Sequence, residues 1–334
     1  MFKLDDKVEF PTRTNDILAI GELLIDMIST EYDANHGSNT YMRYFGGSPS
    51  NIAMNVKKLG IHSLIASAVG KDGLGEFLIN HLHKASIDPS YVQEVECSTS
   101  MVVVNKSKAT PVPIFYRGAD YHLDFTSKLE EAVLQSKIVH FSCWPISMTP
   151  SRQTIEKVIE LAKSNNILVC FDPNYHPMIW QKGEDGVDYV KSIISKADII
   201  KPSEDDAERL FGKDSHENQI AKFLKLGAKL VIMTLSKDGA IVSDGKETIK
   251  CHSLEEIEQS LGKPVVQRLV KLIKFRNEYP AFNGEFNVLD SDSDVICLSW
   301  QKNEAECTLF IDLKTYKSVI SYVDENGQET QYLV

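Results

Sequence analysis

Strands and helices alternate along most of this chain, and that alternation restricts the fold more than any other feature. Apolar segments with strand character recur between residues 17 and 250, with helical segments between them. Apolar strands linked by helices form a parallel sheet that is buried on both faces. The pattern predicts an α/β fold with a doubly wound, mostly parallel sheet whose ligands bind outside the carboxyl ends of the strands. The segments are ILAIGELLID, SLIASAVG, KIVHFSCW, ILVCFD, ADIIKPS and KLVIMTLS.

The segment FGGSPSNIAMNVKKLG, residues 45–60, combines two glycines with a helix start. The glycines let the backbone approach a ligand without an intervening Cβ, and Ser48-Pro49-Ser50 supplies a cap and a rigid first turn. We predict a helix over about residues 51–59. Its free N–H groups and the Asn51 amide suit a ligand made of hydroxyls, such as a sugar. A glycine turn before an ordinary helix would explain the same residues.

The preceding segment ILAIGELLIDMIST, residues 17–30, predicts one buried strand that ends at a site. Asp26 interrupts its apolar run, and burying an aspartate is costly unless the carboxylate has a partner. The alternative is a residue at the strand end that caps a neighbouring turn.

These segments resemble the PfkB (ribokinase-like) carbohydrate kinases and, within them, the fructokinases. The resemblance covers about residues 15–250. It implies a ribokinase-like fold that transfers a phosphoryl group from ATP, with Mg²⁺, to a hydroxyl of a hexose such as fructose. The matching motifs are GELLID, FGGSPSNIA, VGKDGLGEFL, FYRGAD, FDPNYHPMIW and KPSEDDAERLFG.

Two insertions, EYDANHGSNTYMRYF and TSMVVVNKSKATPVPIFYRG, read as hairpin-like strands. The resemblance implies that they form a β lid over the sugar. In that family the lid often pairs two subunits, so a homodimer through the lid is an expectation here.

The resemblance also implies roles for individual residues. The sugar hydroxyls would be bound by Asp26, Gly46, Gly47, Asn51 and Arg117. The nucleotide and its phosphates would be held by Asp172, Asn174, Ser203, Asp206, Thr234, Ser236 and Gly239. Asp206 would reach a hydrated Mg²⁺ through water. A solvated arginine on an edge strand explains Arg117 equally, and an Asp-Pro-Asn turn alone would explain Asp172 and Asn174.

The sequence departs from the family at three places. His176 stands where many relatives carry arginine, and Ser236 replaces a more usual glycine. Most importantly, the family's D-T-x-G-A-G-D element is absent, and no Gly-Ala-Gly-Asp occurs anywhere in the chain. That element supplies the N–H groups that hold the transferred phosphoryl group and the aspartate base, so its loss removes most of the catalytic apparatus. The base in this chain is therefore unknown, and the candidates left open are Asp244, Asp290, Asp292 and Asp294.

From about residue 254 to 334 the chain resembles the C-terminal end of the sucrose phosphorylases. A helix in PVVQRLVKLIKFRNEYPAFNGEF precedes the strands VICLSW, CTLFIDL and KSVISYV, and Asn326-Gly327 is a hairpin signal. We predict a helix and a small antiparallel β domain over residues 253–334. They would follow a truncated kinase domain over residues 1–252.

Composition narrows the partners and the compartment. The formal charge of −11 argues against nucleic acid and anionic membranes as partners. No apolar run reaches 18 residues and the N-terminal residues lack a secretory leader, which predicts a cytoplasmic protein. Six scattered cysteines without metal-ligand spacing predict reduced thiols.

Three hypotheses remain open. The first is an ATP-dependent sugar kinase of fructokinase type. The second is a non-catalytic protein, descended from such a kinase, that binds a sugar or a nucleotide. The third is a product of fused sucrose-utilisation genes, because both parts resemble enzymes of sucrose metabolism.

Overall fold

A computed structural model describes residues 10–32, 37–107, 113–251, 264–315, 317–324 and 327–333. Contacts between residues divide the chain into two compact units. The main unit comprises residues 1–57 and 62–255, and the C-terminal unit comprises residues 58–61 and 256–334.

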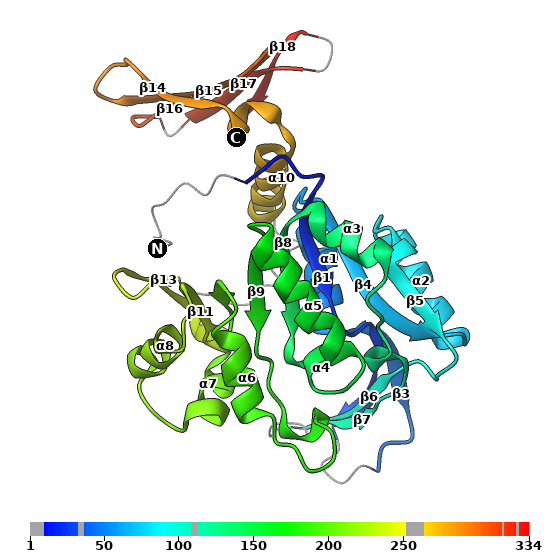
Figure 1. The fold of residues 1–334 in the computed structure, drawn as a ribbon. Coiled ribbons are helices and arrows are strands. Elements are labelled where there is room, and N and C mark those ends of the chain that lie inside the picture. The colour runs from blue at the N-terminus through cyan, green and yellow to red at the C-terminus, as the bar shows by residue number, and fades with distance from the viewer. Residues whose placement is uncertain are drawn as a thin grey trace. The chain divides into compact units, whose positions relative to one another are not determined.

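A nine-stranded sheet forms the centre of the main unit (Figure 1). Its order is β13-β12-β11-β10-β9-β8-β1-β4-β5, and every pairing is parallel except those of β12 with β11 and β13. The predicted doubly wound, mostly parallel sheet is therefore confirmed. The strands are β1 (Asn15–Ile20), β4 (Ser63–Gly70), β5 (Val92–Val95), β8 (Ser136–Ser142), β9 (Leu168–Asp172), β10 (Ile199–Ile200), β11 (Leu230–Thr234), β12 (Ala240–Ser243) and β13 (Thr248–Cys251).

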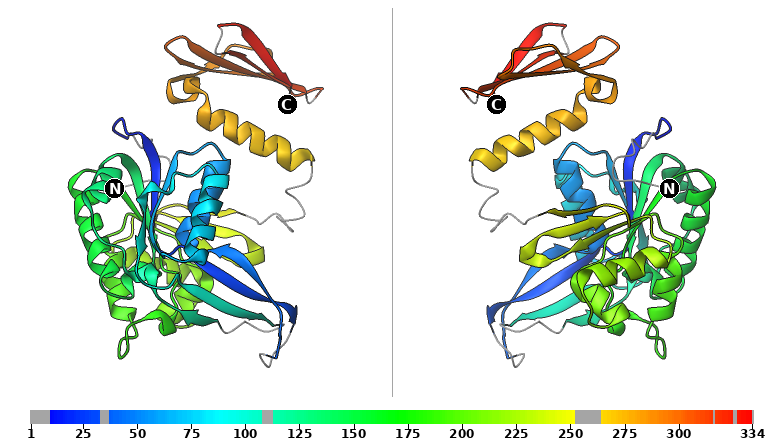
Figure 2. Two further views of the ribbon diagram at one scale, coloured as in Figure 1. Left: turned by 90° about the vertical axis from the view of Figure 1, so that its right-hand side faces the viewer. Right: turned by 90° about the vertical axis from the view of Figure 1, so that its left-hand side faces the viewer.

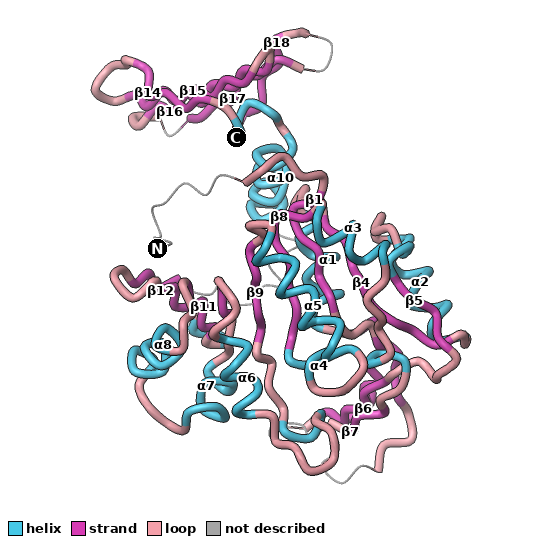
Figure 3. The backbone as a smooth tube through the Cα atoms, viewed as in Figure 1, coloured by secondary structure: helices cyan, strands magenta, loops and turns pink. Residues whose placement is uncertain are grey.

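Helices cover both faces of this sheet (Figure 3). Along β1, Leu18 and Ile20 belong to one apolar core and Ala19 belongs to the other, as the two-residue period of a strand requires. Helices α1 and α2 pack on the Ala19 side, and α3, α5, α6, α7 and α8 pack on the opposite side. The helices are α1 (Ser48–Lys58), α2 (Gly73–Lys84), α3 (Ser127–Leu134), α4 (Cys143–Ile146), α5 (Ser151–Ser164), α6 (Val187–Ile194), α7 (Glu204–Phe211) and α8 (His216–Lys225), with 3₁₀ turns η1 (Pro89–Tyr91), η2 (Ala119–Tyr121), η3 (Pro177–Ile179) and η4 (Ser236–Asp238).

The Ala19 side of the sheet is incompletely covered. Ile138, Leu168, Ile199 and Ile232 lie on this side and are only half-buried, whereas the alternate positions of the same strands are buried.

The predicted lid is a separate four-stranded sheet, the lid sheet, with the order β3-β2-β6-β7. Its strands are β2 (Leu24–Tyr32), β3 (Tyr41–Gly46), β6 (Met101–Lys106) and β7 (Ile114–Tyr116). Figure 2 shows these strands extending beyond the main sheet. The expectation of one strand over residues 17–30 is wrong. The run divides after Ile20 at Gly21, whose φ is 147°, so Asp26 lies in the lid sheet and not at the end of a core strand.

Local capping explains where helices α1 and α2 begin. Asp72 caps α2 by accepting hydrogen bonds from the N–H groups of Leu74 and Gly75, and the helix ends at Lys84. Helix α1 begins at Ser48, three residues before the predicted start. Proline fits the first turn of a helix because its missing N–H is not needed there, so Pro49 lies inside the helix instead of preceding it.

The C-terminal unit consists of a helix and an antiparallel meander, as predicted. The order β14-β15-β16-β17-β18 follows the sequence, and Ala281, Cys307 and Ile320 are buried between the sheet and the helical segment. Asn326 lies outside the described residues, while Gly327 has a φ of 74° in the β17–β18 turn. The elements are α10 (Pro264–Glu278), η5 (Pro280–Asn283), β14 (Glu285–Leu289), β15 (Val295–Lys302), β16 (Ala305–Asp312), β17 (Lys317–Val323) and β18 (Glu329–Leu333).

All six cysteines are free thiols. In the described part of the chain, no helix has both the length and the apolar character needed to cross a membrane.

Candidate active site

Two polar residues, Glu22 and Ser142, lie at the switch point of the main sheet. From β1 the chain builds outward through β4 and β5 on one side, and β8 to β11 follow on the other side. Ligands of doubly wound sheets bind where the strand order reverses in this way. Here that point lies between the carboxyl ends of β1 and β8, where Glu22 follows β1 and Ser142 ends β8.

Glu22 connects three segments at this point. Its carboxylate accepts a hydrogen bond of 2.9 Å from the Ser48 N–H at the start of α1 and one of 3.0 Å from the Ser142 hydroxyl. Burial raises the pKa of the Glu22 carboxyl to about 7. Sequence reasoning missed this residue, although a glutamate inside the apolar GELLID run was a signal of the same kind as Asp26.

Gly46 and Gly47 form a turn that only glycine can make. Gly47 has a φ of 107°, and a Cβ there would lie 2.2 Å from the Glu22 carbonyl oxygen. A Cβ on Gly46 would lie 2.3 Å from Oδ2 of Asp26. The space beside the two glycines is therefore taken by the Glu22 carbonyl oxygen and the Asp26 carboxylate. The Asp26 carboxylate lies against the glycine turn as a result.

Asp26 is the carboxylate best suited to receive hydroxyl donors. Burial raises the pKa of its carboxyl to about 6. Among the described residues, no donor hydrogen-bonds to the Asp26 side chain, and Asn51 in α1 also makes no side-chain hydrogen bond there. The Asn51 backbone N–H donates to the Gly47 carbonyl at 3.0 Å, so it is not one of the free N–H groups we expected.

Cross-strand pairing places a lid residue on the same side as Asp26. Asp26 is paired with Tyr44 on β3 and with Val102 on β6, and Val102 is paired with Phe115 on β7. Directly paired residues point to the same face of a sheet. The Phe115 ring contacts the Trp144 and His176 rings at centroid distances of 5.4 and 5.1 Å. The face of the lid sheet that bears Asp26 is thus turned toward the main sheet.

Arg117, which the resemblance gives as a sugar ligand, is not a solvated edge residue. Its side chain is only 9% exposed and is paired with Asp120. All five of its N–H groups already donate to protein acceptors. A sugar hydroxyl could accept from Arg117 only if one of these bonds were broken.

The residues expected to hold phosphate lie along the neighbouring strand ends. Asp172 ends β9 and forms an ion pair of 2.8 Å with Lys201, which follows β10. Burial raises the pKa of Asp172, and the Lys201 cation opposes that shift. Asn174 follows in the left-handed region with a φ of 35°, as the turn interpretation predicts.

The Asp206 side chain lies at the start of α7 and is hydrogen-bonded by neighbouring backbone groups. Its carboxylate accepts from the Tyr175 N–H at 2.6 Å and from the Ser203 N–H at 2.9 Å, and with Ser203 it forms a capping box at the start of α7. Only 4% of Asp206 is exposed. Within the described ranges, no three His, Cys, Asp or Glu side chains gather as metal ligands would.

The nucleotide-side residues lie beside this capping box. Ser203 forms a bridge with Thr234 at the end of β11, which brings the two predicted positions together. Ser236 has a φ of 52° and Gly239 a φ of 95° in the turn that follows. Ser236 thus adopts a conformation that glycine enters more readily, which explains why glycine is more usual there.

Two of the carboxylates considered as substitute bases have hydrogen-bond or ion-pair partners. Asp244 accepts from the N–H groups of Lys246 and Glu247 within its own turn, and Asp294 is paired with Lys314 at 2.5 Å. Asp290 and Asp292 are exposed.

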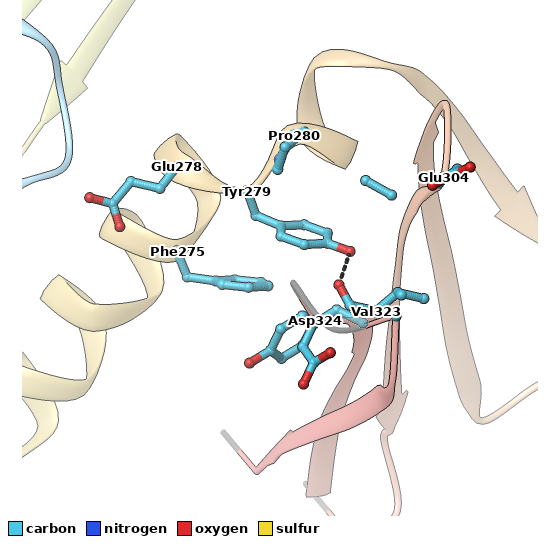
Figure 4. Close-up of a pocket in the computed structure, with 10 residues that line it drawn as sticks. Phe275, Glu278, Tyr279, Pro280, Glu304, Val323 and Asp324 are labelled. Carbon is cyan, nitrogen blue, oxygen red and sulfur yellow. Dashed lines mark hydrogen bonds between the residues drawn. The ribbon is translucent and has the colours of Figure 1, made fainter.

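A separate cavity of about 780 Å³ lies within the C-terminal unit. Its rings include Phe275 and Tyr279, which are stacked at 5.2 Å, and the Tyr279 hydroxyl donates to the Val323 carbonyl at 2.7 Å (Figure 4). The carboxylates of Glu278 and Glu304 point away from these rings. The cavity therefore has an aromatic wall, and Asp324 also lines it.

The doubly wound sheet, the lid sheet and the carboxylate beside a glycine turn define a ribokinase-like fold of the sugar-kinase type. Residues 14–260 match the sequence profile of the pfkB family carbohydrate kinases, and the chain belongs to that family. The ATP-dependent 6-phosphofructokinase of Thermoanaerobacterium thermosaccharolyticum is 57% identical over 263 residues, which are 78% of this chain and 82% of that relative. The solved structure of Halothermothrix orenii fructokinase is 38% identical with a TM-score of 0.68, and the match covers 79% of this chain and 98% of that one.

The C-terminal part is similar to a different protein. It is 60% identical over 83 residues to the sucrose 6(F)-phosphate phosphorylase of Thermoanaerobacterium thermosaccharolyticum. Those residues are 25% of this chain and 17% of that relative.

Proposed function

We propose that the chain descends from an ATP-dependent kinase of fructokinase type, that it binds a ketohexose at Asp26, and that it transfers phosphate poorly or not at all. The observation that carries the sugar site is the half-buried Asp26 carboxylate of the lid sheet, which lies against Gly46 without a hydrogen-bond donor among the described residues. A sugar hydroxyl would supply the missing donor. Gly46, Gly47 and Asn51 would surround it.

The loss of turnover follows from the chemistry of phosphoryl transfer. That reaction depends on positioning and charge stabilisation, which the family obtains from the Gly-Ala-Gly-Asp element. The chain lacks this element, and Asp206 is committed to the start of α7. Losing the anion cradle and the base together should lower kcat by many orders of magnitude, because each typically contributes at least about a hundredfold.

The ketose could be fructose or its 6-phosphate. One relative is a fructokinase and another a 6-phosphofructokinase. Lys201 is a candidate cation near the strand ends for a phosphate, whether of the sugar or of ATP bound through Thr234, Ser236 and Gly239. Burial lowers the pKa of His176, which favours its neutral form there. The two sugars are therefore compared directly in the experiment below.

We also propose that the chain is a fusion of two parts, over residues 1–252 and 253–334. The two parts match two different enzymes of one organism, a 6-phosphofructokinase and a sucrose 6(F)-phosphate phosphorylase. A role in sucrose metabolism and a homodimer through the lid belong to this proposal. A fusion would explain the origin of each part. It would not say whether the chain has kinase activity.

Calorimetric titration with fructose, fructose 6-phosphate and ATP with Mg²⁺, run beside a coupled assay of ADP release, tests these proposals. Sugar binding without turnover supports them. A kcat in the ordinary kinase range of about 1–100 per second would overturn the loss of catalysis and would mean that another residue acts as the base. No binding of either sugar would overturn the Asp26 site.

A further inference from the structure

We infer that Arg117 and Asp120 form a buried anchor that positions strand β7 of the lid sheet, and with it Phe115, over the sugar site. Arg117 is then a positioning residue and not a sugar ligand. The sugar part of this inference rests on the function proposed above, whereas the anchoring of β7 can be tested without a ligand.

The donors of Arg117 join β7 to two other parts of the main unit. Nε and Nη2 donate to the Asp120 carboxylate. Nη1 donates to the Ser147 hydroxyl at 2.6 Å and to the Ile179 carbonyl at 2.8 Å, and Nη2 also donates to the Trp144 carbonyl at 3.3 Å. The guanidinium lies 4.6 Å from the Trp144 ring centroid as well. One side chain thus joins the end of β7 to α4, to the residue that follows α4, and to η3.

Asp120 completes the anchor from the side of β6. Its carboxylate accepts from the Ser100 hydroxyl, from the indole N–H of Trp144 and from the Gly118 N–H, in addition to Arg117. The Asp120 side chain is fully buried. A buried carboxylate remains charged only when it is paired and hydrogen-bonded, and Asp120 meets both conditions.

Strand β7 needs this support because its own pairing is short. It has three residues and is paired with β6 through three residue pairs, at the edge of the lid sheet. Two of its three side chains, Ile114 and Tyr116, are 42% and 52% exposed. The third, Phe115, packs on Trp144, which is itself bonded to the anchor.

The position of β7 matters for the sugar because Phe115 lies in the same cross-strand row as Asp26. A β7 strand that separates from β6 would withdraw the Phe115 ring from this face and admit water to the Asp26 carboxylate. Water competes with sugar hydroxyls for a carboxylate, so a released lid edge weakens sugar binding without removing a sugar contact.

Amide hydrogen exchange of the ligand-free protein, followed by mass spectrometry, tests the anchor. In Asp120→Asn and in Arg117→Met, peptides that cover β7 and the start of β6 should exchange at least tenfold faster, while peptides of β1 and β8 keep wild-type rates. Arg43→Met is the matched control: Arg43 lies on β3 of the same sheet, is exposed, and contacts the Phe77 ring. Its exchange should match wild type.

Fructose titration of the same variants separates positioning from direct binding. If Arg117 is a positioning residue, Asp120→Asn and Arg117→Met lower fructose affinity by similar factors of at least tenfold, and the double variant is no weaker than either single variant. Arg117→Lys retains the charge and loses most of the donors, so its fructose affinity should lie between those of Arg117→Met and wild type. This variant replaces Arg117→Met in the test if Arg117→Met does not fold. If wild type binds no fructose, the proposed sugar site is wrong. The hydrogen-exchange experiment then tests the anchor by itself.

Two results would overturn the anchor. The first is unchanged exchange of β7 in Asp120→Asn and Arg117→Lys, with or without lost fructose affinity. The second is faster exchange throughout the main unit, which would show that the pair supports the whole fold and not the lid edge.

Discussion

Replacing Asp26 with asparagine should stabilise the ligand-free protein and weaken its binding of fructose. Burial raises the pKa of the Asp26 carboxyl to about 6, against about 3.9 in an unfolded chain. The difference of about two units corresponds to about 3 kcal/mol. Because the pKa in the folded state is the higher one, the folded protein binds the proton more tightly. Stability is therefore full below about pH 4 and is lost as the pH rises through about 6. Asparagine does not titrate, so Asp26→Asn avoids this loss.

The effect on binding has the opposite sign. Fructose hydroxyls would donate to a charged carboxylate, and a hydrogen bond to a charged group contributes about 1.5–3 kcal/mol. Fructose affinity should therefore fall by roughly ten- to a hundredfold in Asp26→Asn, and by a similar amount in Asp26→Ala. In wild type the affinity should rise with pH through about 6 as Asp26 ionises, and in the variant it should be independent of pH in this range.

Urea unfolding at pH 5 and at pH 7.5 measures the stability difference. From the two pKa values, the advantage of Asp26→Asn should be about 1.5 kcal/mol at pH 5 and about 3 kcal/mol at pH 7.5. Asp72→Asn is a control of the same chemistry, because hydrogen bonds from the N–H groups of Leu74, Gly75 and Thr99 lower the pKa of Asp72. That variant should be less stable than wild type at neutral pH. An Asp26→Asn variant that is destabilised at pH 7.5, or whose advantage is equal at both pH values, would refute the reasoning.

Three further changes have defined outcomes. Gly47→Ala should lower the free energy of unfolding in urea by more than about 2 kcal/mol, because the new Cβ would meet the Glu22 carbonyl oxygen. Gly183→Ala, at a positive φ in open space, should lower it by only about 1–2 kcal/mol. Equal losses of stability in the two variants would contradict the steric argument. Glu22→Gln should flatten the pH dependence of the unfolding free energy between about pH 4.5 and 7, because the pKa of Glu22 is raised from 4.5 to about 7 and wild type loses stability through that window. A profile parallel to that of wild type would show that Glu22 does not titrate there. Residues 1–252 alone should self-associate in light scattering through the half-buried side of the sheet, and a stable monodisperse monomer would count against this.

The sequence by itself determined the features that short stretches of chain encode. The alternation of apolar strands and helices gave the doubly wound sheet, and Ser48-Pro49-Ser50 gave the start of α1 to within three residues. Period-two segments and turn residues gave the antiparallel tail. Each of these depends on periodicity and turn chemistry within about ten residues, so neighbours in sequence suffice to specify it.

Tertiary structure decided which polar residues meet. The sequence analysis interpreted the apolar run that contains Asp26 as one strand, whereas the structure divides it at Gly21 between two sheets. An apolar sequence indicates a strand but does not indicate which sheet the strand joins. Arg117 read as a sugar ligand, yet its acceptors include the Ile179 carbonyl, 62 residues away. Glu22 went unnoticed because its partner Ser142 lies 120 residues further along the chain. Such contacts form only when distant strand ends are brought to one edge of the sheet, so no local pattern specifies them.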